Sequence, residues 1–272
     1  MRFGYADTSF GQLHYAEQGS GPALLLLHQT PRSWDEFREL IPLLANEFRV
    51  IAMDMPGFGA SAALPAPQTI EAYAGAAWEL LDALGIERAT AFGHHTGAAV
   101  AMEMAAERSA CLDAVVLSSC PWVDAAYRAG HSGSGGVDRA DHTPDGEHLR
   151  TLWELRRPYY PEPVTELLDR FVHDALSFGI DPAEGHRACG RYRMEERIGA
   201  VTVPVLLMAG GADPFALPNQ PHLRKHLTAA PNVDETVIDD GTVALIETQA
   251  VRVADAVRAF LSSQVNNVEP IH

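Results

Sequence analysis

The chain is poor in the features that mark secreted, metal-binding and membrane-spanning proteins. Its 272 residues include only three cysteines, Cys111, Cys120 and Cys189, an odd number without the spacing of a metal motif, so neither a disulfide framework nor a zinc site is indicated. The longest apolar run, at 23–27, is far shorter than the roughly 20 residues that span a bilayer. The N-terminus lacks the apolar stretch of a signal peptide. We expect reduced thiols and a cytoplasmic location.

Positive charge is also scarce. The sequence has 20 Lys and Arg against 36 Asp and Glu, for a formal net charge of -16. Nucleic acids and anionic membranes are bound by clustered Lys and Arg, so we expect neither as a partner. With 47% hydrophobic and 21% charged residues, the composition is that of a globular domain. Oligomeric state is not indicated by the sequence, and a homodimer stays open.

Strand-like apolar runs alternate with helix-like stretches through most of the chain. Strands are predicted at 11–17, 23–27, 49–53, 90–92, 114–118 and 203–208, and helices at 33–46, 70–84, 96–108 and 250–261. Ser33 can cap the first helix, with Glu36 three residues later, and Gly85 can end the second. Such alternation predicts a mostly parallel sheet with helices on both faces.

The alternation stops between residues 121 and 200. This stretch contains a Gly/Ser-rich loop at 130–136 and two helix-like segments at 147–157 and 163–178. We therefore predict a core made of residues 1–120 and 201–272, with residues 121–200 inserted as a helical cap on a mobile loop. A cap there would overhang the carboxyl ends of the strands, where open α/β sheets bind ligands. The alternative is an insertion without function.

Four motifs in a fixed order carry a resemblance to a known family. They are Leu26 to His28 at a strand end, Asp54 to Ser61 (DMPGFGAS), Gly93 to Gly97 (GHHTG) between a strand and a helix, and Gly210 to Asp213 after a later strand. Together they resemble the α/β-hydrolase superfamily over nearly the whole chain. The resemblance implies a mostly parallel eight-stranded sheet flanked by helices, with an inserted helical cap.

Two departures from the family pattern matter more than the matches. The third residue of the GHHTG turn, normally Ser, Cys or Asp, is His95. The position that the family gives to its triad histidine is Thr242, and no histidine lies between His226 and His272. The resemblance implies that Asp213 is the triad acid. The chain therefore keeps an acid but lacks both the serine and the base.

These departures predict a different use of the site. A serine needs a base to remove its proton, whereas an imidazole at the same place can itself be the base. With only Thr242 opposite, we expect the ring of His95 to approach Asp213, which would fix its tautomer and raise its basicity. General-base catalysis of this kind contributes about 10² to 10⁴ in rate. The N–H of Thr96, with one from Gln29 or Thr30, would hold an oxyanion.

Other residues near these motifs are candidate pocket residues. His28, Gln29 and Arg32 belong to the expected oxyanion loop, where Gln29 replaces a more usual glycine. Arg32 would receive a substrate carboxylate bidentately, or else lie on the surface. Trp122 follows a strand end and is a candidate pocket wall, as is Cys120 before it.

Several other interpretations stay open at this point. His95 can be the remnant of a lost site, Asp213 can cap a helix before Pro214, and His94 is expected to be structural. His28, His94 and His95 lie close enough for a metal site, but their spacing matches no zinc motif, so we expect no metal and no cofactor. The histidines of the insertion show no ligand spacing and are either solvent-facing or polar pocket residues. These are His131, His142, His148, His173 and His186.

The sequence thus predicts a cofactor-independent hydrolase, with a lyase-like cleavage driven by proton transfer as the open alternative. Its substrate would be a small, partly apolar organic molecule, an ester, a lactone or a compound cleaved at a C–C or C–O bond. The chemistry would be general-base and non-covalent, centred on His95. The rival is a catalytically silent small-molecule-binding or scaffold protein on the same fold.

Overall fold

A computed structural model describes residues 1–131, 138–161, 165–177 and 179–266. They form an eight-stranded sheet with the order β1-β2-β4-β3-β5-β6-β7-β8. β1 and β2 run antiparallel to their neighbours, and the remaining pairs are parallel. The mostly parallel eight-stranded sheet is therefore as predicted. The strands are β1 (Arg2–Thr8), β2 (Gly11–Gln18), β3 (Ala23–Leu27), β4 (Arg49–Met53), β5 (Ala89–His94), β6 (Leu112–Ser118), β7 (Val205–Gly210) and β8 (Val233–Ile238).

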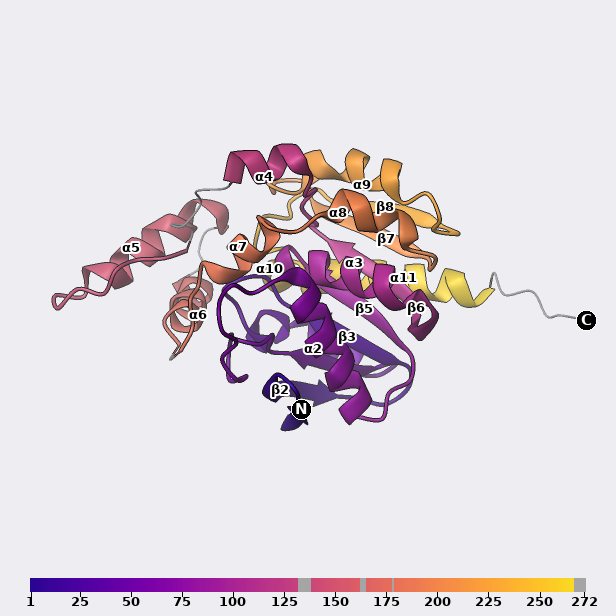
Figure 1. The fold of residues 1–272 in the computed structure, drawn as a ribbon, viewed down its shortest axis with the longest axis horizontal. Coiled ribbons are helices and arrows are strands. Elements are labelled where there is room, and N and C mark those ends of the chain that lie inside the picture. The colour runs from indigo at the N-terminus through magenta and orange to yellow at the C-terminus, as the bar shows by residue number, and fades with distance from the viewer. Residues whose placement is uncertain (132–137, 162–164, 178, 267–272) are drawn as a thin grey trace, which may run out of the picture.

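Helices cover both faces of this sheet (Figure 1). α2 (Ile70–Ala83) and α3 (Thr96–Arg108) pack together on one face, and α1 (Leu40–Leu44) and α11 (Ala250–Asn266) on the other. β3 shows why both faces need a cover. Leu25 and Leu27 belong to the hydrophobic cluster beneath α2 and α3, whereas Leu24 and Leu26 belong to the opposite cluster. A strand buried on both faces reads as a continuous apolar run.

The prediction of one continuous helix at 33–46 is wrong, because the segment forms two separate helices. It forms a short 3-10 helix, η1 (Trp34–Phe37), followed by α1 (Leu40–Leu44). Ser33 does cap the first piece and accepts the N–H of Asp35 at 3.3 Å. Pro42 explains the break, because it has no N–H for the carbonyl of Arg38 and its ring would clash with that carbonyl in a continuous helix.

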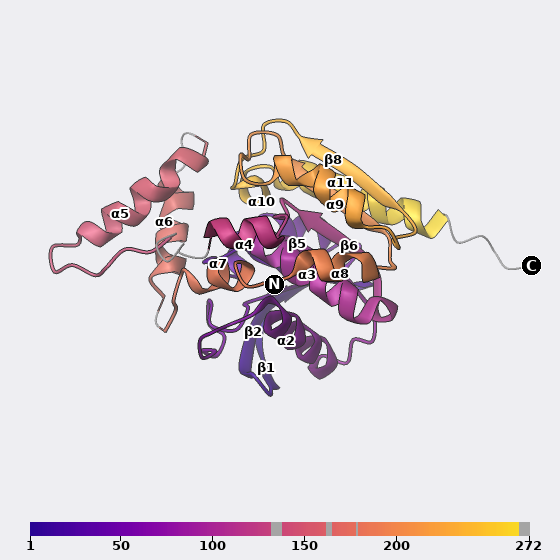
Figure 2. The ribbon, with the colours of Figure 1, turned by 45° about the horizontal axis from the view of Figure 1, so that its top comes forward.

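Residues 121–200, here called the inserted segment, lie between β6 and β7 and are mainly helical. α5 and α6 lie farthest from the sheet, and α7 lies between them and the sheet (Figures 1 and 2). Most of the Gly/Ser-rich loop, at 132–136, and both ends of the helix predicted at 163–178 fall outside the described residues. The helices here are α4 (Ala125–His131), α5 (Glu147–Arg156), η3 (Arg157–Tyr159), α6 (Thr165–Ala175), α7 (Glu184–Cys189), α8 (Met194–Arg197) and η4 (Ile198–Ala200).

The remaining elements are short. They are η2 (Ser109–Cys111), η5 (Leu217–Asn219), α9 (Gln220–His226) and α10 (Leu245–Thr248). Within the described residues, none of the helices combines the length and the apolar character needed to cross a bilayer.

Candidate active site

The turn between β5 and α3 holds His95 in a strained conformation. Its backbone has φ 47° and ψ -111°, a region that costs free energy for any residue with a side chain. The flanking glycines permit the turn, because a Cβ on Gly93 would collide with the carbonyl of Gly97, and a Cβ on Gly97 with the carbonyl of Leu27. The N–H of His95 donates to the carbonyl of Ser118 at 2.9 Å. The imidazole therefore projects from a fixed backbone at the N-terminus of α3.

The ring of His95 lies against the carboxylate of Asp213. Its Nε2 is 2.9 Å from Oδ2 of Asp213, and the two side chains are 16% and 0% exposed. The contact is close but not linear, since neither atom has a well-aligned hydrogen bond. The other carboxylate oxygen accepts the N–H of Phe215 at 2.9 Å, so Asp213 also holds the turn that follows β7. Asp213 does not cap a helix, because the next helix, η5 (Leu217–Asn219), has Ala216 at its N-cap position.

The charge state of Asp213 follows from these contacts. Burial raises the pKa of this carboxyl, but the His95 ring and the N–H of Phe215 more than compensate, so the pKa is lowered to about 2. Asp213 is then a carboxylate at neutral pH and favours a proton on Nε2 of His95. Nδ1 of His95 has no hydrogen-bonding partner in the described part of the chain. It is the ring nitrogen left for a molecule in the cavity.

Both ring nitrogens of His94, and both of His28, make hydrogen bonds. Nε2 of His94 donates to the carbonyl of Val243 at 3.1 Å, and Nδ1 accepts the hydroxyl of Ser118 at 3.0 Å. Burial and the neighbouring His95 lower the pKa of His94 to about 3, which keeps it neutral. Nδ1 of His28 donates to the carbonyl of Gln29 at 2.8 Å, and Nε2 accepts an N–H at 2.9 Å. Neither ring has a free nitrogen for a metal.

Metal ligands are not gathered elsewhere either, as far as the structure describes the chain. No group of three or more His, Cys, Asp or Glu side chains is arranged to hold a metal ion among the residues described.

The expected oxyanion donors are only partly available. Both the backbone N–H and one side-chain N–H of Gln29 donate to buried Glu36, at 2.8 and 2.5 Å, so the backbone N–H of Gln29 is not left for an oxyanion. Burial raises the pKa of Glu36 to about 7. The hydroxyl of Thr30 donates to that of Thr96 at 3.2 Å, which places these two residues side by side. The N–H of Thr96 is in the first turn of α3 and has no partner within the helix.

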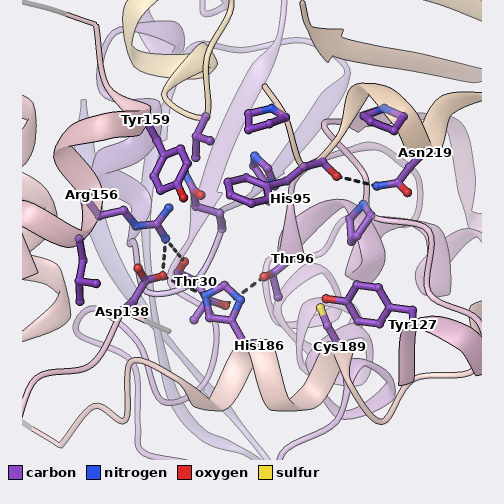
Figure 3. Close-up of a pocket in the computed structure, with 17 residues that line it drawn as sticks. Thr30, His95, Thr96, Tyr127, Asp138, Arg156, Tyr159, His186, Cys189 and Asn219 are labelled. Atoms are coloured by element: carbon purple, nitrogen blue, oxygen red, sulfur yellow. Dashed lines mark hydrogen bonds and ion pairs between the residues drawn. The ribbon is translucent and has the colours of Figure 1, made fainter. Parts of the chain in front are cut away.

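A cavity of about 820 Å³ opens beside His95. Gln29, Thr30 and Thr96 line it with His95, and Figure 3 shows the polar groups around it. Much of the rest of the wall is apolar or aromatic and includes Pro121, Leu155, Tyr159, Pro214, Phe215, Pro218 and Val243. A largely apolar pocket with a few convergent polar groups is typical of small-molecule sites.

Arg32 is not in this cavity, contrary to the expectation that it meets a substrate or lies on the surface. It is fully buried, and its guanidinium contacts Asp174 at 2.8 Å, Glu247 at 2.6 Å and Asp35 at 3.3 Å. Asp174 is in α6, so this buried cluster attaches the inserted segment to the core. Two of the three partners, Asp174 and Glu247, lie 142 and 215 residues away in the sequence, a pairing that sequence does not reveal.

Four other expected pocket residues also lie outside the cavity wall, and one of them, His28, is fully buried. Thr242 is half-buried and its hydroxyl accepts the N–H of Ala244 at 3.3 Å, although the adjacent Val243 lines the cavity. Trp122 stacks on His226 with ring centroids 4.4 Å apart. The thiol of Cys120 is buried, and burial raises its pKa, so it carries no thiolate.

Sequence reasoning missed a polar group that the inserted segment brings to the cavity. Asp138, Arg156, His186 and Cys189 all line it. The sequence offers His186 only as one of the scattered histidines and Cys189 only as a reduced thiol. No motif connects them, because they come from three separate parts of the insertion. Burial raises the pKa of Cys189 to about 12, so it remains a thiol.

The sequence matches a family model, described as alpha/beta hydrolase fold, over residues 22–242. The chain belongs to the α/β-hydrolase fold family.

Three curated relatives share part of this sequence. The bifunctional epoxide hydrolase 2 of Mus musculus is 43% identical over 112 residues, 38% of this chain and 19% of that protein. The haloalkane dehalogenase 2 of Mycobacterium tuberculosis H37Rv is 34% identical over 114 residues, 42% of this chain and 40% of that protein. The soluble epoxide hydrolase of Corynebacterium sp. C12 is 39% identical over 94 residues, 35% of this chain and 33% of that protein. The chain thus matches less than half the length of each relative.

Solved structures resemble the chain over almost its full length. A hydrolase from Pseudomonas aeruginosa PA01 superimposes with a TM-score of 0.80 at 21% identity, covering 96% of this chain and 98% of that one. The enol-lactonase from Burkholderia xenovorans LB400 gives a TM-score of 0.77 at 21% identity, covering 95% and 100%. At these identities the likeness shows the fold alone.

Proposed function

We propose that this chain is a cofactor-independent hydrolase that uses His95 as a general base without a covalent intermediate. Its substrate is a small, partly apolar ester, lactone or compound cleaved at a C–C or C–O bond. The observation that carries the proposal is the 2.9 Å contact between His95 Nε2 and buried Asp213, at the wall of an 820 Å³ cavity. Residues 121–200 act as the cap over a core of residues 1–120 and 201–272.

The roles of the side chains follow from their contacts. Asp213 keeps the proton on Nε2 of His95, so Nδ1 accepts a proton from a water molecule. The water oxygen bonds to the substrate carbonyl carbon, and the N–H groups of Thr96 and Thr30 receive the oxyanion. Collapse of this intermediate breaks the bond to the leaving group, which takes up a proton. An ester and water thus become an acid and an alcohol.

The relatives support the hydrolase class. Their names denote epoxide hydrolases and a haloalkane dehalogenase, enzymes that act on small organic molecules. The largely apolar cavity fits substrates of that kind. Catalysis at His95 itself rests on the geometry of this chain.

The rival is a catalytically silent binding protein on the same fold, for which the strained turn at His95 would be a relic. A panel of nitrophenyl esters, alkyl esters and lactones separates the two. The proposal expects turnover of at least one class above the buffer rate. Tight binding of panel members, measured by calorimetry, without turnover of any would favour the rival.

Mass spectrometry decides whether the chemistry is covalent. The protein is mixed with excess 4-nitrophenyl butanoate and quenched in acid during turnover. We expect the intact mass of the unmodified chain, because water attacks the substrate directly. An acyl adduct that forms and decays at the turnover rate would overturn the non-covalent mechanism.

A further inference from the structure

The inserted segment carries a second histidine–carboxylate pair into the same cavity. Nε2 of His186, in α7, is 2.9 Å from Oδ2 of Asp138. The Asp138 side chain is only 4% exposed, whereas that of His186 is 28% exposed and lines the cavity. We call His186 and Asp138 the insert pair, and His95 and Asp213 the sheet pair. In both pairs a buried carboxylate faces Nε2, which leaves Nδ1 for a ligand.

Asp138 is held in place by more than the histidine. Arg156, from the end of α5, makes an ion pair with the same oxygen. Although burial works against it, the pKa of Asp138 is lowered by Arg156 and His186, so the residue is a carboxylate. Asp138 has a φ of 58°, and such strain in a residue with a side chain is common at functional sites. The carboxylate of Asp138 is thus held in place by both Arg156 and His186.

The insert pair lies next to the expected oxyanion donors. α7 packs directly on Thr30, because a Cβ at Gly185 would collide with the Thr30 side chain. Arg156 also donates to the carbonyl of Thr30 at 3.5 Å. His186 follows Gly185, so its ring enters the cavity beside Thr30 and Thr96. In Figure 3, His186, Asp138 and Arg156 lie together on one side of the cavity.

We propose that His186, oriented by Asp138, is a second catalytic residue that protonates the leaving group. This rests on the function proposed above. His95 is fixed at its backbone by the strained turn and at Nε2 by Asp213, so it serves the attacking water. The leaving group occupies another vertex of the tetrahedral intermediate, and His186 lines the same cavity as His95 from the inserted segment, so we assign it the role of proton donor.

The proton balance closes with both residues. His95 Nδ1 takes a proton from water as the new C–O bond forms, and protonated His186 gives one from Nδ1 as the bond to the leaving oxygen breaks. Solvent then returns the proton from His95 to His186. The net change is ester and water to acid and alcohol, without any other reactant.

Leaving-group dependence tests this role. Nitrophenolate departs without a proton, whereas an alkoxide does not. We expect His186→Gln to slow the hydrolysis of propyl butanoate about 10²-fold and to change that of 4-nitrophenyl butanoate little. Asp138→Asn should show the same pattern more weakly. His173→Gln is the matched control, since His173 is in the inserted segment but its side chain is 82% exposed, and it should alter neither rate.

The other outcomes separate failure of this inference from failure of the proposed function. Equal loss on both esters would assign His186 to the oxyanion or to the structure of the cavity, and no loss on the alkyl ester would remove it from the reaction; both overturn the inference and leave the proposed function intact. Failure of the wild-type chain to hydrolyse either ester, or full activity of His95→Ala, would overturn the proposed function and this inference with it. Thermal unfolding of each variant shows whether it is folded.

Discussion

The sheet pair and the insert pair consist of the same two residue types, but the chain builds them differently. His95 and Asp213 stand at the carboxyl ends of β5 and β7, where hydrogen-bonded strands fix their separation. His186 and Asp138 come from helix and loop of the inserted segment, and Arg156 takes the place of the sheet as the support. In the proposed mechanism the core carries the base, His95, and the inserted segment carries a second histidine, His186.

The largest difference between the two pairs should appear when each carboxylate becomes an amide. Asp213→Asn removes the carboxylate that lies 2.9 Å from Nε2 of His95, so the ring is no longer held with Nδ1 as the proton acceptor, and we expect kcat/KM for 4-nitrophenyl butanoate to fall about 10²- to 10⁴-fold. Asp138→Asn should leave the same reaction nearly unchanged. Steady-state kinetics on both variants measures this, and equal losses would show that the two pairs do not have separate roles.

The second largest effect should be a loss of stability when the ion pairs between the inserted segment and the core are broken. Arg32→Met leaves Asp174 and Glu247 buried without their partner, and breaking a buried ion pair costs about 3 to 5 kcal/mol. Urea unfolding should detect this loss in the free energy of unfolding. Arg150→Met is the control, because the ion pair of Arg150 with Glu147 is exposed and its loss should be undetectable. A similar stability for both variants would show that the buried cluster does not hold the insertion.

The smallest effect concerns His94, the neighbour of the sheet pair. Its pKa is about 3 when folded and about 6.5 when unfolded. The unfolded chain therefore binds the extra proton between these values, and stability is lost as the pH falls from about 6.5 towards 3. Between pH 7 and pH 5 this amounts to about 2 kcal/mol. His94→Gln keeps a donor for the Val243 carbonyl but cannot titrate.

Urea unfolding of both proteins at several pH values tests the His94 prediction. The slope of stability against pH over this range should be smaller for His94→Gln than for the wild type. Parallel slopes would mean that His94 does not resist protonation in the folded state.

Most of the sheet and the contact between His95 and Asp213 were predictable from sequence, but several expected pocket residues lie outside the cavity wall. Local apolar patterns predict six of the eight strands but neither β1 nor β8, and the GHHTG turn with Asp213 two strands later predicts the position of the sheet pair. What failed depends on contacts between distant residues or on one overriding residue. Pro42 breaks a helix that the apolar spacing favours. Arg32 forms buried ion pairs with carboxylates from α6 and α10 instead of lining the cavity. The insert pair was invisible because only the folding of the insertion brings His186 and Asp138 together.

Hydrolysis of 4-nitrophenyl butanoate by His95→Ala tests the central claim most directly. The variant removes the imidazole but leaves Asp213, the cavity and the inserted segment in place, and its unfolding temperature shows whether the fold is kept. We expect the folded variant to lose about 10²- to 10⁴-fold in kcat/KM relative to the wild type, while His173→Ala loses nothing. A folded His95→Ala protein that hydrolyses the ester at the wild-type rate would contradict the assignment of His95 as the base.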